Sequence, residues 1–209
     1  MSNWEKNVRK VVPYVPGEQP QNKVIKLNTN ENPYPPSPNV INKIKSMNLD
    51  NMRLYPDPDV TLLKDRIASY YNLKRNQVFV GNGSDEILAF IFMTFFNKSD
   101  NIYYPDITYS FYPVYSDLFG LNEIAIPLNK YFEINIEDYF RLNGHIIITN
   151  PNAPTSIALT LKEVEKIIIN NPNNLIIVDE AYVDFGAESS VSLIDKYDNL
   201  LVVQTFSKS

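Results

Sequence analysis

A lysine near the end of the printed sequence, Lys208, is the side chain with the clearest potential for chemistry. It follows an apolar run, residues 200–203, that predicts a buried strand, so Ser207 and Lys208 lie where this strand gives way to a loop. Ligands of open α/β sheets bind outside the carboxyl ends of the strands. A lysine amine at such a place could form a Schiff base with a carbonyl compound. The alternative is an ordinary solvated lysine.

A loop with two glycines, residues 81–86, follows another predicted strand and opens a predicted helix. Glycines let the backbone approach a ligand closely, and a helix N-terminus attracts anions. The loop is not a Walker A motif, because no Gly-Lys-Ser/Thr follows, and Glu86 replaces the third glycine of the dinucleotide fingerprint. It is therefore either an anion cradle formed by Gly83, Ser84 and Asp85 or a tight turn in which Ser84 or Asp85 caps the helix.

Two carboxylates, Asp179 and Glu180, follow a third predicted strand, residues 175–178, and Tyr182 comes shortly after them. Such a pair could bind a metal, as in a Walker B strand, or hold a protonated ring nitrogen. It could also be a hydrogen-bonded strand end without further function. Without a Walker A loop the nucleotide-binding interpretation fails.

Two more predicted strands are followed by side chains that could line a cavity. Asn152 lies in an Asn/Pro turn after residues 145–149, where a turn-forming role alone would explain it, and Tyr109 follows residues 102–104. The five strand–helix junctions thus hold an anion cradle, an aromatic ring, an amide, a carboxylate near a tyrosine, and an amine. Pyridoxal phosphate needs that set: an amine for its aldehyde, a carboxylate for its ring nitrogen and a cradle for its phosphate.

The composition excludes several classes of protein. The 209 residues, 44% hydrophobic and 21% charged, are typical of a soluble globular protein, and the net charge of −5 gives no basic surface for nucleic acid. No apolar run approaches the ~20 residues of a membrane span. Cysteine is absent and His145 is the single histidine, so we predict no metal site built from these residue types. We expect a cytoplasmic protein.

Apolar strands alternate with helices along most of the chain, which predicts a parallel sheet covered by helices on both faces. The predicted strands are residues 78–80, 102–104, 124–126, 145–149, 175–178 and 200–203. The predicted helices are residues 4–10, 40–47, 60–71 with Asp59 as N-cap, 86–96, 109–119 with an interruption at Pro113, 161–170 and 191–197.

The motifs together resemble the fold-type-I pyridoxal-phosphate aminotransferases, and most closely the histidinol-phosphate aminotransferase family. The stretches that carry the resemblance are residues 28–34 (NTNENPY), 55–57 (YPD), 81–86 (GNGSDE), 151–156 (PNAPTS), 178–182 (VDEAY) and 205–208 (TFSK). The resemblance implies a three-layer α/β/α fold with a mostly parallel sheet, the large domain of the aspartate-aminotransferase type. Residues 1–36 would form an N-terminal arm or small-domain segment, and residues 37–209 an incomplete cofactor-binding domain.

The resemblance also implies roles for the matching residues. Lys208 would be the Schiff-base lysine and proton shuttle, and Asp179 would pair with the pyridine nitrogen. Tyr182 and Asn152 would bind the ring hydroxyl, although Ala153 stands where relatives often carry asparagine. The remaining roles are ring stacking by Tyr109, phosphate binding by Gly83, Ser84, Asp85 and Ser207, phosphate binding across a homodimer by Tyr55, and substrate contact by Asn32 and Tyr34.

The implied reaction is transamination between histidinol phosphate and 2-oxoglutarate, a step of histidine biosynthesis. One alternative is a same-fold aminotransferase or decarboxylase acting on another small phosphorylated amine or amino acid, and another is a non-catalytic fragment that only binds or associates. Relatives continue beyond Lys208 with substrate- and phosphate-binding arginines and an antiparallel strand between residues 200–203 and 78–80. We therefore expect the 209-residue chain to be inactive alone.

Overall fold

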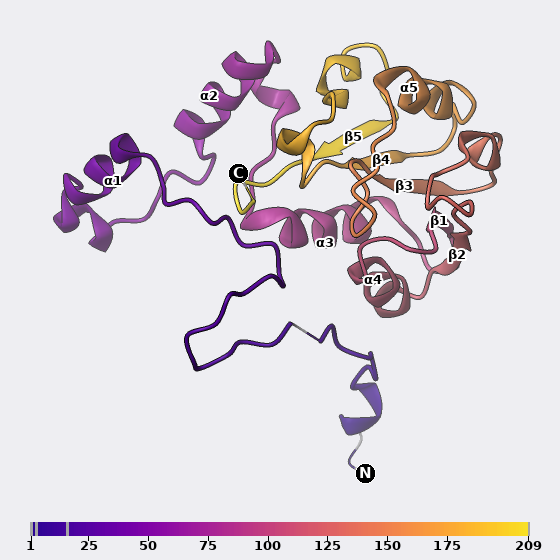
Figure 1. Cartoon of the computed structure of the whole chain (residues 1–209), viewed down its shortest axis with the longest axis horizontal. Helices are drawn as coiled ribbons and strands as arrows, with labels where there is room; N and C mark the ends of the chain where they lie inside the picture. Colours follow the sequence, from indigo (N-terminus) through magenta and orange to yellow (C-terminus); the bar gives the residue numbers. More distant parts are fainter. Residues whose placement is uncertain (1, 3, 16, 209) are drawn as a thin grey trace. The chain divides into compact units, whose positions relative to one another are not determined.

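The computed structural model describes residues 2, 4–15 and 17–208, which form two compact units. One unit consists of Met1–Val24 and Asn82–Ser209, and the other is Ile25–Gly81. In Figure 1 the sheet and helices α3, α4 and α5 belong to the first unit, whereas α1 and α2 belong to the second. The domain boundary expected after residue 36, between an N-terminal segment and the cofactor-binding domain, stays a prediction.

The first unit is built on a five-stranded parallel sheet with strand order β2-β1-β3-β4-β5. Its strands are β1 (Asn101–Pro105), β2 (Asn122–Ile126), β3 (His145–Thr149), β4 (Ile176–Asp179) and β5 (Leu200–Val203). Each of them was predicted to within two residues at either end. Strands β3, β4 and β5 read as nearly unbroken runs of isoleucine, leucine and valine, as is typical of parallel sheets covered on both faces.

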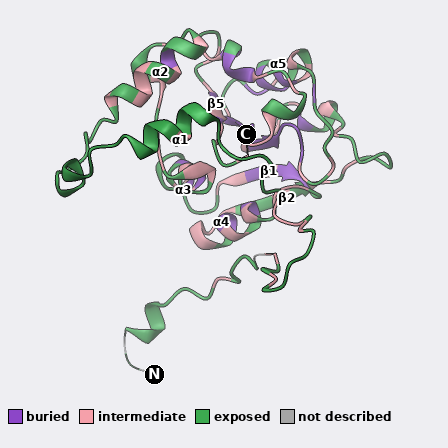
Figure 2. Cartoon of the chain, turned by 60° about the vertical axis from the view of Figure 1, so that its left-hand side comes forward, coloured by how far each residue is buried: buried purple, intermediate pink, exposed green. Residues whose placement is uncertain are grey.

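Helices cover both faces of this sheet (Figure 1), which confirms the three-layer fold. The helices are α3 (Gly83–Phe95), α4 (Phe111–Phe119) and α5 (Leu161–Ile169). Ile146 and Ile148 pack in the cluster that includes α5, whereas Ile147 packs with α3 and α4. This division follows from the strand itself, since successive side chains point to opposite faces. Figure 2 shows the buried residues concentrated in the strands and the inner sides of these helices.

Several expectations about individual elements are wrong. Residues 78–80 precede α3 without forming a strand: Val78 has an extended backbone, with φ −115° and ψ 125°, but no strand of the sheet pairs with it. Pro113 does not interrupt α4, because the helix begins at Phe111 and the third residue of a helix has no intrahelical acceptor for an N–H. The helix expected at residues 191–197 is only a short 3-10 helix, η6 (Ser190–Leu193).

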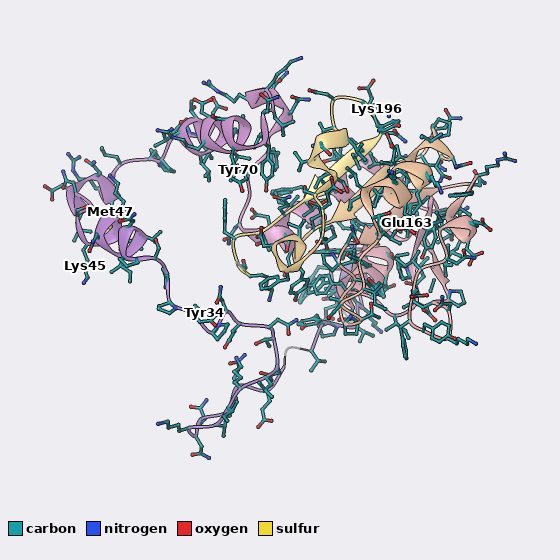
Figure 3. All side chains as sticks on the ribbon, turned by 45° about the horizontal axis from the view of Figure 1, so that its top comes forward. Tyr34, Lys45, Met47, Tyr70, Glu163 and Lys196 are labelled. Carbon is teal, nitrogen blue, oxygen red and sulfur yellow. The ribbon has the colours of Figure 1, made fainter. Side chains whose placement is uncertain are left out.

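The second unit contains α1 (Pro38–Lys45) and α2 (Thr61–Tyr71). The N-cap position of α2 is occupied by Val60 and not by the predicted Asp59, and the carboxylate of Asp57 accepts the N–H of Thr61 at 2.8 Å. The side chains of Tyr34 and Tyr70 extend away from the backbone in Figure 3 and are 79% and 82% exposed. Residues 4–10, predicted to be a helix, form only the short 3-10 helix η1 (Glu5–Asn7). The other 3-10 helices of the described residues are η2 (Leu49–Arg53), η3 (Arg75–Gln77), η4 (Ile136–Tyr139) and η5 (Val183–Phe185).

Candidate active site

The carboxyl ends of the central strands meet at one edge of the sheet. Thr149, the last residue of β3, is in register with Asp179 at the end of β4, and Asp179 is in register with Val203 at the end of β5. Tyr182 follows β4 and Lys208 follows β5, so both leave the sheet at this edge. The topology therefore provides the common edge that the predicted site requires.

Asp179 is a carboxylate enclosed by the protein, with 2% of its surface exposed. The Tyr112 hydroxyl donates to its Oδ2 at 2.7 Å, and the Ala181 N–H donates to its Oδ1 at 3.2 Å. Burial raises the pKa of Asp179 to about 6, the two hydrogen bonds oppose this rise, and the charges of Asp85 and Glu180 add to it. A positive group beside Asp179 would favour its ionised form, so the residue is suited to hold a protonated ring nitrogen.

Tyr109 links the start of α4 to the start of α3. Its hydroxyl donates to Asp85 Oδ1 at 2.8 Å, and the Tyr115 hydroxyl donates to the Asp85 carbonyl at 2.7 Å. Burial raises the pKa of Tyr109 well above its usual range, and the charges of Asp85 and Asp179 contribute to the rise. The Tyr109 hydroxyl is therefore neutral, and the charges of Asp85 and Asp179 both act on it.

The predicted anion cradle lies beside the segment that leads to Lys208. Gly83, Ser84 and Asp85 form the first turn of α3, and Gly83 adopts a left-handed φ of +81°. A Cβ at Gly83 would lie 4.0 Å from the Ser207 hydroxyl, so the structure brings these two predicted phosphate-binding positions together. N–H groups in the first turn of a helix have no intrahelical acceptor and are free to bind an anion.

The Lys208 amine lies near the tyrosine that follows Asp179. Its Nζ is 5.8 Å from the centre of the Tyr182 ring, within the range of a cation–π interaction. This contact joins the segment after β5 to the segment after β4. Lys208 and Tyr182 thus lie close together at the sheet edge where Asp179 ends β4, while the catalytic roles of all three stay predictions.

Asn152 is brought to the site, but its amide group is already engaged. Its Nδ2 donates to the Ile107 carbonyl at 2.9 Å and to the Thr155 hydroxyl at 3.2 Å, and its Oδ1 accepts from the Thr108 hydroxyl at 2.8 Å. The residue is 2% exposed. A bond from Asn152 to a ring hydroxyl would have to use the remaining lone pair of Oδ1 or displace one of these partners.

The other predicted residues lie in the second unit. Tyr55 is fully exposed, at 101%, and Tyr34 is exposed as well. The side chain of Asn32 accepts the N–H of Tyr34 at 2.9 Å, a local turn contact. The roles expected for Tyr55 on a partner subunit, and for Asn32 and Tyr34 near substrate, stay predictions.

Three hydroxyl residues of the site, Thr108, Tyr112 and Thr149, were not predicted from the sequence. Tyr112 is fully buried against Asp179, and Thr149 accepts or donates to it at 2.7 Å. Two signals were available in the sequence. Thr149 ends its strand just as Asp179 does, and Tyr112 follows Tyr109 by three residues, which places both on one side of a helix.

Metal and membrane sites were also considered for residues 2, 4–15 and 17–208. Among them no group of three or more histidine, cysteine, aspartate or glutamate residues is arranged to hold a metal ion. None of the helices in that part of the chain combines the length and apolarity needed to cross a bilayer.

Residues 22–209 match the family described as aminotransferase class I and II. The chain is 59% identical over 213 residues to the histidinol-phosphate aminotransferase of Acinetobacter baumannii strain AB307-0294, covering 100% of this chain and 59% of that protein. It is 62% identical over 203 residues to the histidinol-phosphate aminotransferase of Brachyspira hyodysenteriae, covering 96% of this chain and 57% of the relative. The chain therefore spans less than two thirds of the length of these relatives.

Solved structures show the same fold. Histidinol-phosphate aminotransferase from Sinorhizobium meliloti in complex with pyridoxal-5'-phosphate aligns with a TM-score of 0.77 at 21% identity, over 86% of this chain and 51% of that one. L-threonine-O-3-phosphate decarboxylase from Porphyromonas gingivalis aligns with a TM-score of 0.70 at 23% identity, over 81% and 51%. Both likenesses extend across most of the described chain.

Proposed function

The chain belongs to the class I and II aminotransferase family, and on this premise we propose that it binds pyridoxal phosphate and serves a histidinol-phosphate aminotransferase. The observation that carries the proposal is the buried carboxylate of Asp179 at the strand edge, with its Oδ2 already bonded by Tyr112. The relatives named for this activity share 59% and 62% of their aligned residues with the chain.

The residues of the edge fit the chemical groups of the cofactor. Asp179 would hold the ring nitrogen in its protonated form, for which a buried carboxylate with a raised pKa is suited. The first turn of α3 and the Ser207 hydroxyl would bind the phosphate. Tyr182 would bind the ring hydroxyl, with Asn152 as a second partner only if it gives up part of its present bonding.

Pyridoxal phosphate, when bound, supplies an electron-withdrawing ring that makes a proton on the substrate Cα acidic. The Lys208 amine would remove and return that proton, and its neighbour Tyr182 would keep the amine close to the ring. Tyr109 would cover one side of the ring, restricting its orientation. Burial of Asp179 keeps water from competing for the ring nitrogen.

The proposed substrates are histidinol phosphate and 2-oxoglutarate, as the relatives' names suggest. A homodimer would place Tyr55, which is fully exposed in this chain, where it can reach the partner's cofactor phosphate. The cytoplasmic location and the inactivity of the 209-residue chain alone stay predictions.

Turnover by the full-length protein, and not by the 209-residue chain alone, tests the proposal. Glutamate release from histidinol phosphate and 2-oxoglutarate is expected, and Lys208→Ala should abolish it. Lys196→Ala is the matched control, because Lys196 is an exposed lysine paired with Glu165, and it should retain full turnover. Carbon dioxide release from O-phosphothreonine, without glutamate release from histidinol phosphate, would instead favour a decarboxylase of the kind found in Porphyromonas gingivalis.

A further inference from the structure

Three hydroxyl groups lie within hydrogen-bonding distance of one another between Asn152 and Asp179. The Thr108 hydroxyl donates to Asn152 Oδ1 at 2.8 Å and lies 2.9 Å from the Thr149 hydroxyl. The Thr149 hydroxyl lies 2.7 Å from the Tyr112 hydroxyl, which donates to Asp179 Oδ2 at 2.7 Å. We call Thr108, Thr149 and Tyr112 the hydroxyl chain.

The protons of this chain can be counted. Asn152 Oδ1 can only accept, so the Thr108 proton points to it, and ionised Asp179 can only accept, so the Tyr112 proton points to Asp179. Thr149 is left with one proton and two neighbouring hydroxyls, so four short contacts share three hydroxyl protons. When the Thr149 hydroxyl donates to the Tyr112 oxygen, it strengthens the bond from Tyr112 to ionised Asp179, because linked hydrogen bonds polarise one another.

We propose that the hydroxyl chain fixes the Asp179 carboxylate, with Tyr112 and Thr149 as positioning residues: Tyr112 occupies Oδ2 and Thr149 supports Tyr112. Oδ1, which accepts the Ala181 N–H, would keep acceptor capacity for the ring nitrogen of pyridoxal phosphate. The inference rests on the proposed function for the identity of the bound ring. Two members of the hydroxyl chain are buried in this unit, Tyr112 at 0% and Thr149 at 2% exposed, whereas Thr108 is half-buried.

The anchoring of the chain explains why Asn152 bonds inward. Its amide holds Thr108 at one end and is itself held by the Ile107 carbonyl and the Thr155 hydroxyl. Asn152, in the turn after β3, the strand that pairs with β4, therefore holds the Thr108 hydroxyl in place. When Thr149 donates to Tyr112, the Thr108–Thr149 contact carries no hydrogen bond, so the carboxylate of Asp179 is positioned by Tyr112 and Thr149. The other titratable groups that influence Asp179 are Asp85, Glu180 and Tyr109.

The first test removes the hydroxyl that contacts Asp179. In Tyr112→Phe, Asp179 should become about a tenfold weaker acid, measured by the pH titration of its carboxyl carbon in the protein without ligand. Pyridoxal phosphate should bind about tenfold more weakly, measured by its visible absorption. The matched control is Tyr104→Phe, because Tyr104 is also buried and its hydroxyl donates to a different carboxylate, Glu123 Oε2 at 2.6 Å. The substitution keeps the ring, whose centre lies 5.7 Å from the centre of the Tyr112 ring. It should change neither quantity.

The second test cuts the chain one link further away. Thr149→Val keeps the side-chain shape and should weaken the acidity of Asp179 in the same direction by a smaller factor. In the Tyr112→Phe background the same change should have no further effect, because the path to Asp179 is already broken. Equal effects of Thr149→Val in both backgrounds, or an unchanged titration of Asp179 in Tyr112→Phe, would overturn the inference.

The two proposals fail in different ways. A protein that does not bind pyridoxal phosphate at all contradicts the proposed function, and the carboxyl titration still decides whether the hydroxyl chain acts on Asp179. A protein that binds the cofactor equally well with and without the Tyr112 hydroxyl contradicts only the inference drawn here. Circular dichroism of each variant identifies a loss of folding, for which Thr149→Val provides the milder change.

Discussion

Gln204 donates a hydrogen bond from its Nε2 to Glu180 Oε2 at 2.8 Å, joining the segment after β5 to the segment after β4. Glu180 is 1% exposed and also accepts from the Ser189 hydroxyl and the Ser190 N–H, both at 2.6 Å. Its own N–H donates to the Val203 carbonyl at 2.7 Å. Glu180 therefore braces the start of the segment that ends in Lys208.

Replacing this carboxylate by its amide tests the brace. Glu180→Gln keeps the size of the side chain but places an NH₂ group against at least one of the three donors, so a buried donor loses its acceptor. We expect the free energy of unfolding to fall by about 2–4 kcal/mol, measured by urea denaturation. Glu165→Gln is the control at an open ion pair with Lys196 and should change stability much less. Equal losses in the two variants would contradict a bracing role.

The raised pKa of Asp179 predicts how stability depends on pH. Its pKa is about 6 in the folded chain against an ordinary value of 3.8, so the folded state binds the proton more tightly. This tighter proton binding by Asp179 stabilises the folded state. The stabilisation is fully present below pH 3.8 and is lost as pH rises through about 6, a change of ~3 kcal/mol in the free energy of unfolding. Asp179→Asn should therefore be more stable than the parent at pH 8, and the gain should vanish near pH 4. Urea denaturation at several pH values measures this difference.

An exposed aspartate supplies the control for that experiment. Asp184→Asn, in η5, should shift stability little at either pH because Asp184 lies at the surface. Addition of pyridoxal phosphate should reverse the order at pH 8, because a bound cation stabilises the ionised carboxylate only in the parent. A parent protein that gains stability between pH 4 and pH 8 relative to Asp179→Asn would contradict the burial argument.

His145 should show the opposite behaviour. Burial lowers its pKa, the charge of Asp100 opposes this effect, and its Nδ1 accepts the Leu175 N–H at 3.1 Å, so the neutral ring is the bonded form. Its contribution to stability is present above the ordinary value of 6.5 and is lost as pH falls through the folded pKa. Because it is the single histidine, its ring proton signal in NMR reports the pKa directly. Asp100→Asn should lower that pKa further, and a rise would contradict the assignment.

The strands were predictable because strands that are buried on both faces of a sheet consist of consecutive apolar residues. Residues 145–149 and 200–203 are apolar runs, and both became strands with the predicted bounds. Residues 78–80 carry the same kind of pattern but are not among the strands of the described sheet, and strand pairing is a property that a local pattern does not encode. The sequence offers two nearby aspartates at the start of α2, and the local pattern does not determine which of them accepts the Thr61 N–H. In the structure it is Asp57.

The site was predictable to the extent that it follows strand ends. The first turn of α3 was placed beside the other strand ends through a strand at residues 78–80 that the structure does not form, whereas Asp179 and Lys208 could be placed at one edge by topology alone. Tyr112 could not, because its importance arises from a contact with Asp179, which lies 67 positions away in the sequence. The engagement of the Asn152 amide likewise depends on Ile107 and Thr108, which pattern analysis does not connect to it.

Gly83 should be required for anion binding rather than for folding alone. Its φ of +81° is unfavourable for a residue with a Cβ, so Gly83→Ala should lower the free energy of unfolding by about 1 kcal/mol. The same substitution also places a methyl group 4.0 Å from the Ser207 hydroxyl, inside the proposed cradle. We therefore expect about a tenfold loss of affinity for inorganic phosphate and pyridoxal phosphate, measured by calorimetry and visible absorption.

Gly120 provides the matched control for this prediction. It has a similar left-handed φ of +70° and ends α4, where an added Cβ would meet only the flexible side chain of Lys98 at 3.3 Å. Gly120→Ala should thus show a comparable loss of stability, because the backbone cost is the same, with unchanged affinity for both anions. Equal affinity losses in the two variants would show that the effect comes from destabilisation of the fold. Unchanged affinity in Gly83→Ala would place the phosphate elsewhere than the first turn of α3.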